Sequence, residues 1–297
     1  MQEKFQLHAI TVDPIRLPQL AEKKVEADIL RLDKIHPLVS GNKWFKLRFY
    51  LDEAIAQQKK NIVTFGGAWS NHILATAAAC HISNLKSIGI IRGEETATPS
   101  PTLVQAKEAG MQIVFINRQD YADKKIPADL KKDEYYFIPE GGFGEKGVDG
   151  AATILDYCNK ENYTHICCAI GTGTMMAGLV KASASQQQVI GISVLKNNLA
   201  LEENVKTLSG HSAHHFQINH DYHFGGYAKH KTPLLDFMNN FYRQTNIPTD
   251  FVYTGKLVYA ITDLITADFF PTSSRLLLIH SGGLQGNSSL DKGKLIF

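Results

Sequence analysis

Two lysines stand directly after a Gly-Asn pair in the segment "LVSGNKWFKLRFYL", residues 38 to 51. Gly41 and Asn42 are typical of the turn before a helix, which puts Lys43 in the first helical turn and Lys46 one turn further on. The positive end of the helix dipole lowers the pKa of a lysine in the first turn, and such a lysine suits Schiff-base chemistry. Lys43 is therefore a candidate nucleophile, and Lys46 is interpreted as a structural helix lysine. The ordinary alternative is a solvated charge at both positions.

Glycine-rich loops that follow apolar, strand-like runs carry further residues suited to ligand binding. In "FGGAWSNHIL", Ser70, Asn71 and His72 stand at the start of a helix. One of them is enough to cap that helix, so the hydroxyl, amide and imidazole groups together suit a carboxylate or another anion. Simple capping is the alternative, and the anion site is favoured.

The loop in "CCAIGTGTMMAGL" runs from a strand into a helix through Gly171, Thr172, Gly173 and Thr174. Glycines let successive N–H groups point at one anion, and the helix N-terminus adds positive potential, so the loop predicts a phosphate site. It lacks the ending of a P-loop and the spacing of a G-x-G-x-x-G fingerprint. The phosphate is thus expected to belong to a ligand other than ATP or NAD. A third loop, "LIHSGGLQGN" (278–287), is as consistent with a tight turn as with a ligand site.

The combination of a phosphate loop and an amine nucleophile, without a nucleotide motif, points to pyridoxal phosphate as the cofactor. No acidic residue follows the glycine loop at the spacing that binds a ribose. A plain nucleotide-binding protein is therefore the weaker alternative.

Apolar runs of strand length alternate with helical patterns along most of the chain. Strands are expected at 61–67, 85–93 and 111–117 and in "THICCAI", "QVIGISVL" and "SRLLLIHSGG", with helices at 71–82, 100–110 and 149–163 and in "GTGTMMAGLVKASAS" and "GKLVYAITDLITADF". This alternation predicts an α/β fold with βαβ units and buried parallel strands.

Two polar zones, residues 118–140 and 196–232, interrupt this pattern. They indicate two α/β domains that meet near residues 48 and 149. The larger, cofactor-binding domain is expected to comprise residues 1–47 and 149–297, and residues 48–148 form a smaller inserted domain. The active site is expected in the cleft between the two.

Composition narrows the classes of partner. A net charge of +2 over 297 residues, without charged blocks, gives no reason to expect nucleic acid, and no apolar run approaches the roughly 20 residues of a membrane span. The N-terminus does not resemble a secretory signal. The four cysteines show no C-x-x-C spacing, so we expect reduced, buried thiols in a cytoplasmic protein and no metal site.

Five segments resemble, in order and spacing, the motifs of one enzyme family: "HPLVSGNKWFKL", "FGGAWSNHILATAAAC", "CAIGTGTMMAGLV", "GGYAKHKTPLL" and "DFVYTGKLVYAI". This is the family of 1-aminocyclopropane-1-carboxylate (ACC) deaminases and D-cysteine desulfhydrases, which use pyridoxal phosphate. The resemblance covers roughly residues 28 to 290. It implies two open, twisted, mainly parallel sheets flanked by helices, as in the tryptophan synthase β subunit. It also implies a small amino-acid substrate and a homodimer.

The resemblance assigns roles to single positions. Lys43 matches the lysine that bonds the cofactor, Ser70 the active-site serine beside the substrate carboxylate, and Asn71 the partner of the cofactor's phenolic oxygen. His72 matches a residue that closes the carboxylate loop, and residues 171–174 match the phosphate loop. Tyr227 and Tyr253 resemble two active-site tyrosines, the second a candidate for proton transfer, and Thr254 matches the partner of the pyridine nitrogen.

Thr254 separates the two activities of the family. ACC deaminases carry a glutamate at this position, which keeps the pyridine nitrogen protonated for ring opening. A threonine hydroxyl suffices for α,β-elimination with a good leaving group, so D-cysteine desulfhydrase chemistry is expected and ACC deamination is the alternative. Phe45 and Met175 depart from the family pattern, which leaves a non-catalytic pyridoxal-phosphate carrier as a second alternative.

Overall fold

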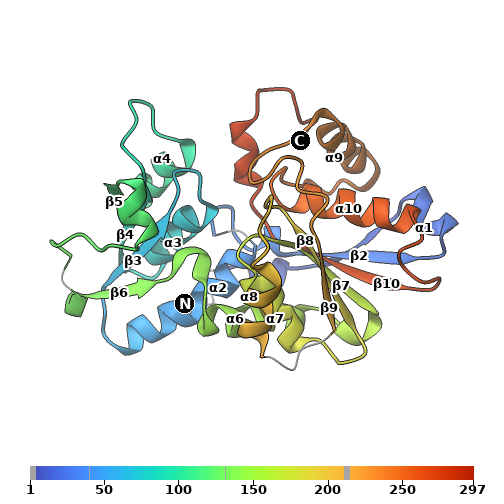
Figure 1. The fold of residues 1–297 in the computed structure, drawn as a ribbon, viewed down its shortest axis with the longest axis horizontal. Helices are drawn as coiled ribbons and strands as arrows, with labels where there is room; N and C mark the ends of the chain where they lie inside the picture. Colours follow the sequence, from blue (N-terminus) through green and yellow to red (C-terminus); the bar gives the residue numbers. More distant parts are fainter. Residues whose placement is uncertain (1–4, 40, 131, 211–214) are drawn as a thin grey trace.

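The strands of the protein form two separate sheets (Figure 1). The computed structural model describes residues 5–39, 41–130, 132–210 and 215–297. A six-stranded sheet has the order β1-β2-β10-β7-β8-β9, and a four-stranded sheet has the order β5-β4-β3-β6. The strands of the larger sheet are β1 (Val12–Ile15), β2 (Glu26–Arg31), β7 (His165–Ile170), β8 (Gln188–Ser193), β9 (Phe216–Asn219) and β10 (Arg275–His280). Those of the smaller sheet are β3 (Asn61–Gly66), β4 (Lys86–Arg92), β5 (Met111–Ile116) and β6 (Tyr135–Ile138).

Strand pairing is parallel throughout both sheets except between β1 and β2, which are antiparallel. Helices cover both faces of the larger sheet (Figure 1). One face carries α1 (Pro18–Glu22), α9 (Thr232–Thr245) and α10 (Thr254–Thr266), and the other carries α6 (Glu145–Ala152), α7 (Thr174–Ala182) and α8 (Leu201–Ser209). The predicted fold of two mainly parallel sheets flanked by helices is confirmed.

The strand β7 shows why the buried strands of this protein are uninterrupted apolar runs in the sequence. Ile166 and Cys168 belong to the hydrophobic core on the α6–α7 side, whereas Cys167 and Ala169 belong to the core under α10. Both faces of the strand are therefore buried, which demands apolar residues at every position. Burial also raises the pKa of the Cys168 thiol to about 12, and all four cysteines are free thiols.

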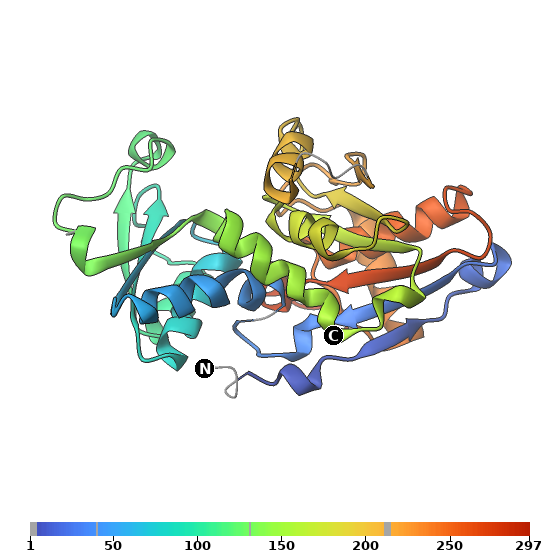
Figure 2. The same ribbon diagram turned by 90° about the horizontal axis from the view of Figure 1, so that it is seen from below.

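Two helices carry the chain between the sheets. The first, α2 (Asn42–Ala56), connects β2 to β3, and α6 leads from β6 back to β7; Figure 2 shows them side by side in the middle of the molecule. Gly150 of α6 lies so close to α2 that a Cβ atom there would sit 1.9 Å from the Phe45 carbonyl oxygen. The expected domain borders near residues 48 and 149 fall inside these two helices, and the division into domains stays a prediction.

The smaller sheet lies between its own helices. On one side α3 (Asn71–Ile82) and α4 (Pro101–Glu108) pack against β4 and β5, and on the other α5 (Arg118–Ala122) contributes the buried Tyr121. The predicted helix at 71–82 and the strands at 61–67, 85–93 and 111–117 agree with the structure to within two residues at either end.

Regular structure also occurs where the sequence pattern is weak. The helix expected at 149–163 is wrong beyond Ala152, where two 3-10 turns, Thr153–Tyr157 and Lys160–Asn162, follow α6. The polar zone 118–140 contains α5 and the edge strand β6, whose tyrosines are half-buried. The zone 196–232 contains α8 and β9, and residues 211–214 of that zone lie outside the described part.

Among the described residues, no helix is long and apolar enough to cross a membrane, and no group of His, Cys, Asp and Glu side chains could hold a metal ion.

The turn before α2 generates a prediction. Gly41 has φ +65°, and a Cβ atom there would lie 1.8 Å from the Ser281 carbonyl oxygen. Gly93 also has a positive φ, of +103°, but its Cβ would meet nothing within 4 Å. We expect Gly41→Ala to lower the free energy of unfolding by about 3 kcal/mol or more, and Gly93→Ala by about 1 kcal/mol, since only the first adds a backbone clash to the strain. Urea denaturation of both variants measures this, and equal losses would contradict it.

Candidate active site

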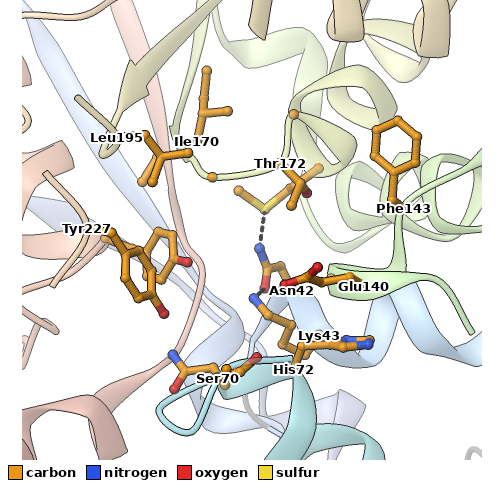
Figure 3. A pocket seen from close by; sticks show the side chains of 18 of the residues that line it. Asn42, Lys43, Ser70, His72, Glu140, Phe143, Ile170, Thr172, Leu195 and Tyr227 are labelled. Carbon is orange, nitrogen blue, oxygen red and sulfur yellow. Dashed lines mark hydrogen bonds between the residues drawn. The ribbon is translucent and has the colours of Figure 1, made fainter. Parts of the chain in front are cut away.

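A cavity of about 720 Å³ opens where loops from both sheets meet (Figure 3). Its walls come from the start of α2, from the loops after β3 and β7, and from the segment after β6. These loops follow the carboxyl ends of parallel strands, which is where open α/β sheets bind ligands. The sequence-predicted residues that line the cavity are Lys43, Ser70, Asn71, His72, Gly171, Thr172, Gly173, Tyr227 and Tyr253.

Lys43 lies in the first turn of α2 and faces the cavity (Figure 3). Its Nζ donates a hydrogen bond to Asn42 Oδ1 at 2.8 Å, and Asn42 Nδ2 contacts Met175 Sδ at 3.2 Å. Burial lowers the pKa of the Lys43 amine to about 8, and the carboxylate of Asp250 opposes this shift. A substantial fraction of Lys43 is therefore neutral and nucleophilic near neutral pH.

Lys46, interpreted from the sequence as a structural helix lysine, also faces the cavity from α2. Its side chain is buried, lines the same cavity, and has no acidic partner within 4 Å in the described part of the chain. Burial, and then repulsion from Lys43, lowers the pKa of the Lys46 amine well below its usual value. An anionic ligand would relieve both costs. The signal was present in the sequence, since residues three apart share one face of a helix.

The loop after β3 leaves its polar groups free. Ser70 is the N-cap residue of α3, yet its hydroxyl makes no capping hydrogen bond, so simple capping does not account for it. His72 is buried, and its Nε2 lies 2.8 Å from Thr64 Oγ1, which itself donates to the Ile138 carbonyl oxygen. Because Thr64 has a single proton, His72 Nε2 must be the donor, and Nδ1 is the unprotonated nitrogen.

The neutral state of His72 follows from its surroundings. Burial, with added repulsion from Lys46 and Lys43, lowers the pKa of His72 well below its usual value. Its Nδ1 is buried without a hydrogen-bond partner among the described residues. His72 therefore offers an acceptor, and not a positive charge, at this wall of the cavity.

The loop after β7 has the features of an anion cradle. Backbone hydrogen bonds in the described part of the chain leave the N–H groups of Thr172 and Gly173 unused, and Gly173 adopts a left-handed conformation directly before α7. Thr174 is buried behind the loop and does not line the cavity; its hydroxyl lies 3.1 Å from that of Thr172. Asn204 of α8 also faces this region, a contribution that the polar sequence around it did not reveal.

Two phenols, those of Tyr227 and Tyr253, line the cavity, and Figure 3 shows Tyr227 on the side away from Phe143. The rings of Tyr227 and Tyr253 meet edge to face, with centroids 6.2 Å apart, and the Lys43 Nζ lies 5.6 Å from the Tyr253 ring centroid. Burial raises the pKa of both phenols above its usual value. Both are therefore protonated and able to donate at neutral pH.

Thr254 begins α10 and is fully buried next to Tyr253, although it is not part of the cavity wall itself. Its hydroxyl makes no hydrogen bond of regular geometry within the described residues. Four residues earlier, Asp250 is also fully buried, and its carboxylate accepts from the N–H groups of Val252, Tyr253 and Thr254 at 2.8 to 3.1 Å. Sequence reasoning missed Asp250, although an aspartate shortly before a helix is a familiar N-terminal signal.

The third glycine loop supports the site from behind. The Asn42 N–H donates to the Ser281 carbonyl oxygen at 3.1 Å, and a Cβ atom on Gly283 would come within 3.0 Å of Asn71 Nδ2. His280 is buried and fixed by the Pro248 carbonyl oxygen at 2.8 Å and by the Gly282 N–H at 3.2 Å. This loop therefore braces Asn42 and Asn71. Because Ser281 and Gly282 also line a small hollow beside Lys43 and Tyr253, both the tight-turn and the ligand-site interpretation stay open.

The cavity fits pyridoxal phosphate by its own chemistry. It combines the Lys43 amine with its lowered pKa, the buried Lys46 side chain, the unused N–H groups of the loop after β7, and the Ser70 hydroxyl, which does not cap α3. A model of the family described as "Pyridoxal-phosphate dependent enzyme" matches residues 7–282. The chain belongs to this family. Pyridoxal phosphate is its cofactor, and the predicted resemblance is confirmed.

Curated relatives are similar along most of their length. A putative ACC deaminase of Pyrococcus abyssi is 28% identical over 295 residues, covering 91% of this chain and 88% of that protein. The bifunctional D-cysteine desulfhydrase/ACC deaminase of Arabidopsis thaliana mitochondria is 29% identical over 281 residues, covering 84% and 70%. An ACC deaminase of Methylobacterium nodulans is 25% identical over 329 residues, covering 95% and 96%.

Solved structures share the fold of this pyridoxal-phosphate enzyme. The crystal structure of an ACC deaminase homologue superposes with a TM-score of 0.78 at 23% identity, covering 94% of this chain and 90% of that one. A hydrogen sulfide-producing enzyme from Fusobacterium nucleatum superposes with a TM-score of 0.68 at 11% identity, covering 94% and 98%.

The two departures from the family pattern have different consequences. Phe45 points away from the cavity, is fully buried, and packs edge to face on Tyr157 at 5.6 Å between ring centroids. Met175 lines the cavity, and its sulfur contacts the amide group that holds Lys43. Met175 therefore belongs to the support of the cofactor amine, whereas Phe45 belongs to the core.

The lowered pKa of Lys43 generates a prediction for the cofactor-free enzyme. The amine is protonated below about pH 8 and neutral above it, so the rate of covalent cofactor attachment should rise with pH and level off above about 8. Borohydride trapping at several pH values, followed by peptide mass spectrometry, measures attachment at Lys43. A midpoint near 10.5, the ordinary lysine value, would contradict the prediction, and Lys43→Ala is the control that should trap nothing.

Proposed function

We propose that the enzyme converts D-cysteine to pyruvate, ammonia and sulfide by α,β-elimination followed by hydrolysis, or a related β-substituted D-amino acid to pyruvate, ammonia and the corresponding leaving group. The observation that carries the proposal is the threonine at the first position of α10, behind the cavity wall. A hydroxyl at the pyridine nitrogen does not protonate it, and elimination of a thiolate needs less electron withdrawal than the opening of a cyclopropane ring.

The substrate carboxylate has a suitable partner set at the start of α3. The Ser70 hydroxyl is free of capping, and the first N–H groups of the helix together with its dipole favour a negative charge. Asn71 lies beside Ser70 on the cavity wall and is the proposed partner of the cofactor's phenolic oxygen. The neutral His72 closes this end of the cavity without adding charge.

The phosphate of the cofactor is proposed to lie between the loop after β7 and Lys46. Gly171, Thr172 and Gly173 present N–H groups there, and Thr174 supports the loop from behind. Lys46 supplies the opposite charge. A phosphate at this position would restore the ordinary protonation of Lys46, because an opposite charge favours the ammonium form.

The proton transfers are proposed to fall to Lys43 and Tyr253. Pyridoxal phosphate supplies the electron sink that stabilises the carbanion. Lys43, with its pKa of about 8, accepts the α-proton of the substrate once its amine is released. Tyr253, neutral and adjacent to Lys43, donates a proton to the departing thiolate, and Tyr227 contacts Tyr253 and orients the substrate.

ACC deamination to 2-oxobutyrate and ammonia is the alternative, because several relatives carry that name. Its chemistry calls for an acid at the pyridine nitrogen. Asp250, four residues before Thr254, is buried, but its carboxylate is already occupied by three backbone N–H groups. Glu140 lines the cavity, but its carboxylate accepts a hydrogen bond from Lys124 Nζ at 2.5 Å. A non-catalytic cofactor carrier is the second alternative, which rested partly on the unusual residue Met175. Because the Met175 sulfur contacts the Asn42 amide that bonds to Lys43, this residue is consistent with an active enzyme.

The proposal includes a cytoplasmic homodimer. Four free thiols, three of them fully buried, agree with a reducing compartment. The dimer is carried by the resemblance to the family, and sedimentation analysis of the purified protein tests it.

The first test of the function is a substrate panel. We expect the purified holoenzyme to release pyruvate and sulfide from D-cysteine faster than 2-oxobutyrate from ACC, and faster than pyruvate from L-cysteine. Lys43→Ala is the inactive control. Faster turnover of ACC would support the alternative deaminase, and bound cofactor without turnover across a panel of D- and L-amino acids would support the carrier.

A matched pair of threonines tests the part played by Thr254. The hydroxyls of Thr254 and Thr249 are both buried without a hydrogen bond of regular geometry among the described residues, but only Thr254 is next in sequence to a residue that lines the cavity, Tyr253. We expect Thr254→Val to lower kcat for D-cysteine about tenfold, because the partner of the pyridine nitrogen is lost, and Thr249→Val to change it less than twofold. Steady-state kinetics measures both, and equal effects would argue against a role of Thr254 at the cofactor.

A further inference from the structure

The segment that carries Tyr227 has an unusual backbone. Phe224, Gly225, Gly226 and Ala228 all have positive φ values, of +53°, +101°, +117° and +52°. Two of these residues are not glycines, and each such conformation costs energy in an unsupported chain. Tyr227 is 42% exposed, so the packing of its own ring does not account for the loop conformation.

Among the described residues, one buried side chain, that of Lys256, bonds to this segment. Lys256, the third residue of α10, is 0% exposed, and its Nζ donates to the carbonyl oxygens of His223 at 2.8 Å and Gly226 at 2.9 Å. The Gly226 N–H also donates to the His223 carbonyl oxygen at 3.0 Å. The ammonium group therefore closes a turn that ends directly before Tyr227.

The burial of Lys256 costs free energy, because it removes the amine from water. Its Nζ has no acidic partner within 4 Å among the described residues, and burial lowers the pKa of its amine to about 8, with Asp250 opposing the shift. A buried ammonium group persists only when its donors are satisfied. Here the two loop carbonyls accept two of its three N–H groups, so the lysine and the loop conformation depend on each other.

The helix that holds Lys256 also carries the cofactor-facing residues. Tyr253 and Thr254 stand at its N-terminus, less than one turn away, and the Asp250 carboxylate fixes the backbone of both. The position of Tyr227 relative to Tyr253 is thus set through one rigid element. Burial of Lys256 in α10 connects the loop to the same backbone that presents the second phenol.

We propose that Lys256 is the positioning residue of Tyr227: its ammonium group holds the loop 223–228 in the conformation that turns the Tyr227 ring toward Tyr253 and the substrate. The inference rests on the proposed function, in which Tyr227 orients the substrate. Lys256 touches neither the cavity nor the substrate and acts through the two carbonyl groups. Its loss should leave cofactor binding intact and weaken substrate binding.

The test compares the holoenzyme with Lys256→Met, which keeps the length of the side chain and removes the donors. We expect hydrogen exchange of peptides covering residues 222–230 to become at least tenfold faster, with unchanged exchange in β7 and unchanged cofactor absorbance. We expect the KM for the turned-over amino acid to rise about tenfold with a smaller change in kcat, and Tyr227→Phe to add little in the double variant.

Lys160→Met is the matched control. The Lys160 Nζ likewise donates to a backbone carbonyl, that of Ala182 at 2.6 Å, but neither residue lines the cavity. It should speed exchange only near residue 182 and leave KM unchanged. Unaltered exchange at 222–230 in Lys256→Met, or KM effects that simply add to those of Tyr227→Phe, would overturn the proposal.

A second variant approaches the loop from the other side. Gly226→Ala strains the loop at φ +117°, whereas its Cβ meets Lys196 only at an ordinary 3.5 Å, and α10 is untouched. It should reproduce the faster exchange and the higher KM, and it decides the question if Lys256→Met does not fold; normal KM with a loosened loop would overturn the proposal. Exchange and cofactor absorbance require no turnover, so inactivity of the wild type toward D-cysteine would count against the proposed function alone.

Discussion

The burial of positive charge around one cavity is the constraint on which the rest of the site depends. Lys43 and Lys46 face the cavity and Lys256 lies behind it, and in the described part of the chain none has an acid at ion-pair distance. Each is therefore driven toward its neutral form. A neutral Lys43 is a nucleophile. A phosphate bound beside Lys46 would return the proton to its amine, and the resulting ion pair would contribute to the affinity for the cofactor.

The charge of Asp250 partly offsets the effect of burial on two of these amines. Its carboxylate accepts hydrogen bonds from three N–H groups at the start of α10. Its negative charge also opposes the lowering of the pKa values of Lys43 and Lys256. Burial raises the pKa of Asp250 itself, and the N–H groups lower it again. One carboxylate thus fixes the helix that presents Tyr253 and moderates the basicity of two amines on either side of it.

Local signals account for what the sequence predicted well. Alternating apolar runs identified β3, β4, β5, β7, β8 and β10, whereas the buried strand β2 was not predicted. The Gly-Asn-Lys and Ser-Asn-His motifs identified the candidate amine and hydroxyl, because turn, cap and nucleophile all lie within a few residues. Lys46 and Asp250 each carried a local signal, but their burial and their electrostatic coupling to Lys43 depend on tertiary packing, which no local pattern reveals. The strands β6 and β9 escaped notice because edge strands are half-buried and carry a weaker pattern.

The two crossings between the sheets limit how the molecule can move. Each crossing consists largely of a helix, α2 or α6. The backbones of these two helices are in close contact at Gly150, so neither helix is suited to act as a hinge. On the second crossing the non-α-helical stretch on the β6 side is 139–144, and its residues Glu140, Gly141 and Phe143 form part of the cavity wall. The segment 139–144 therefore takes part both in the connection between the two sheets and in the wall of the cavity.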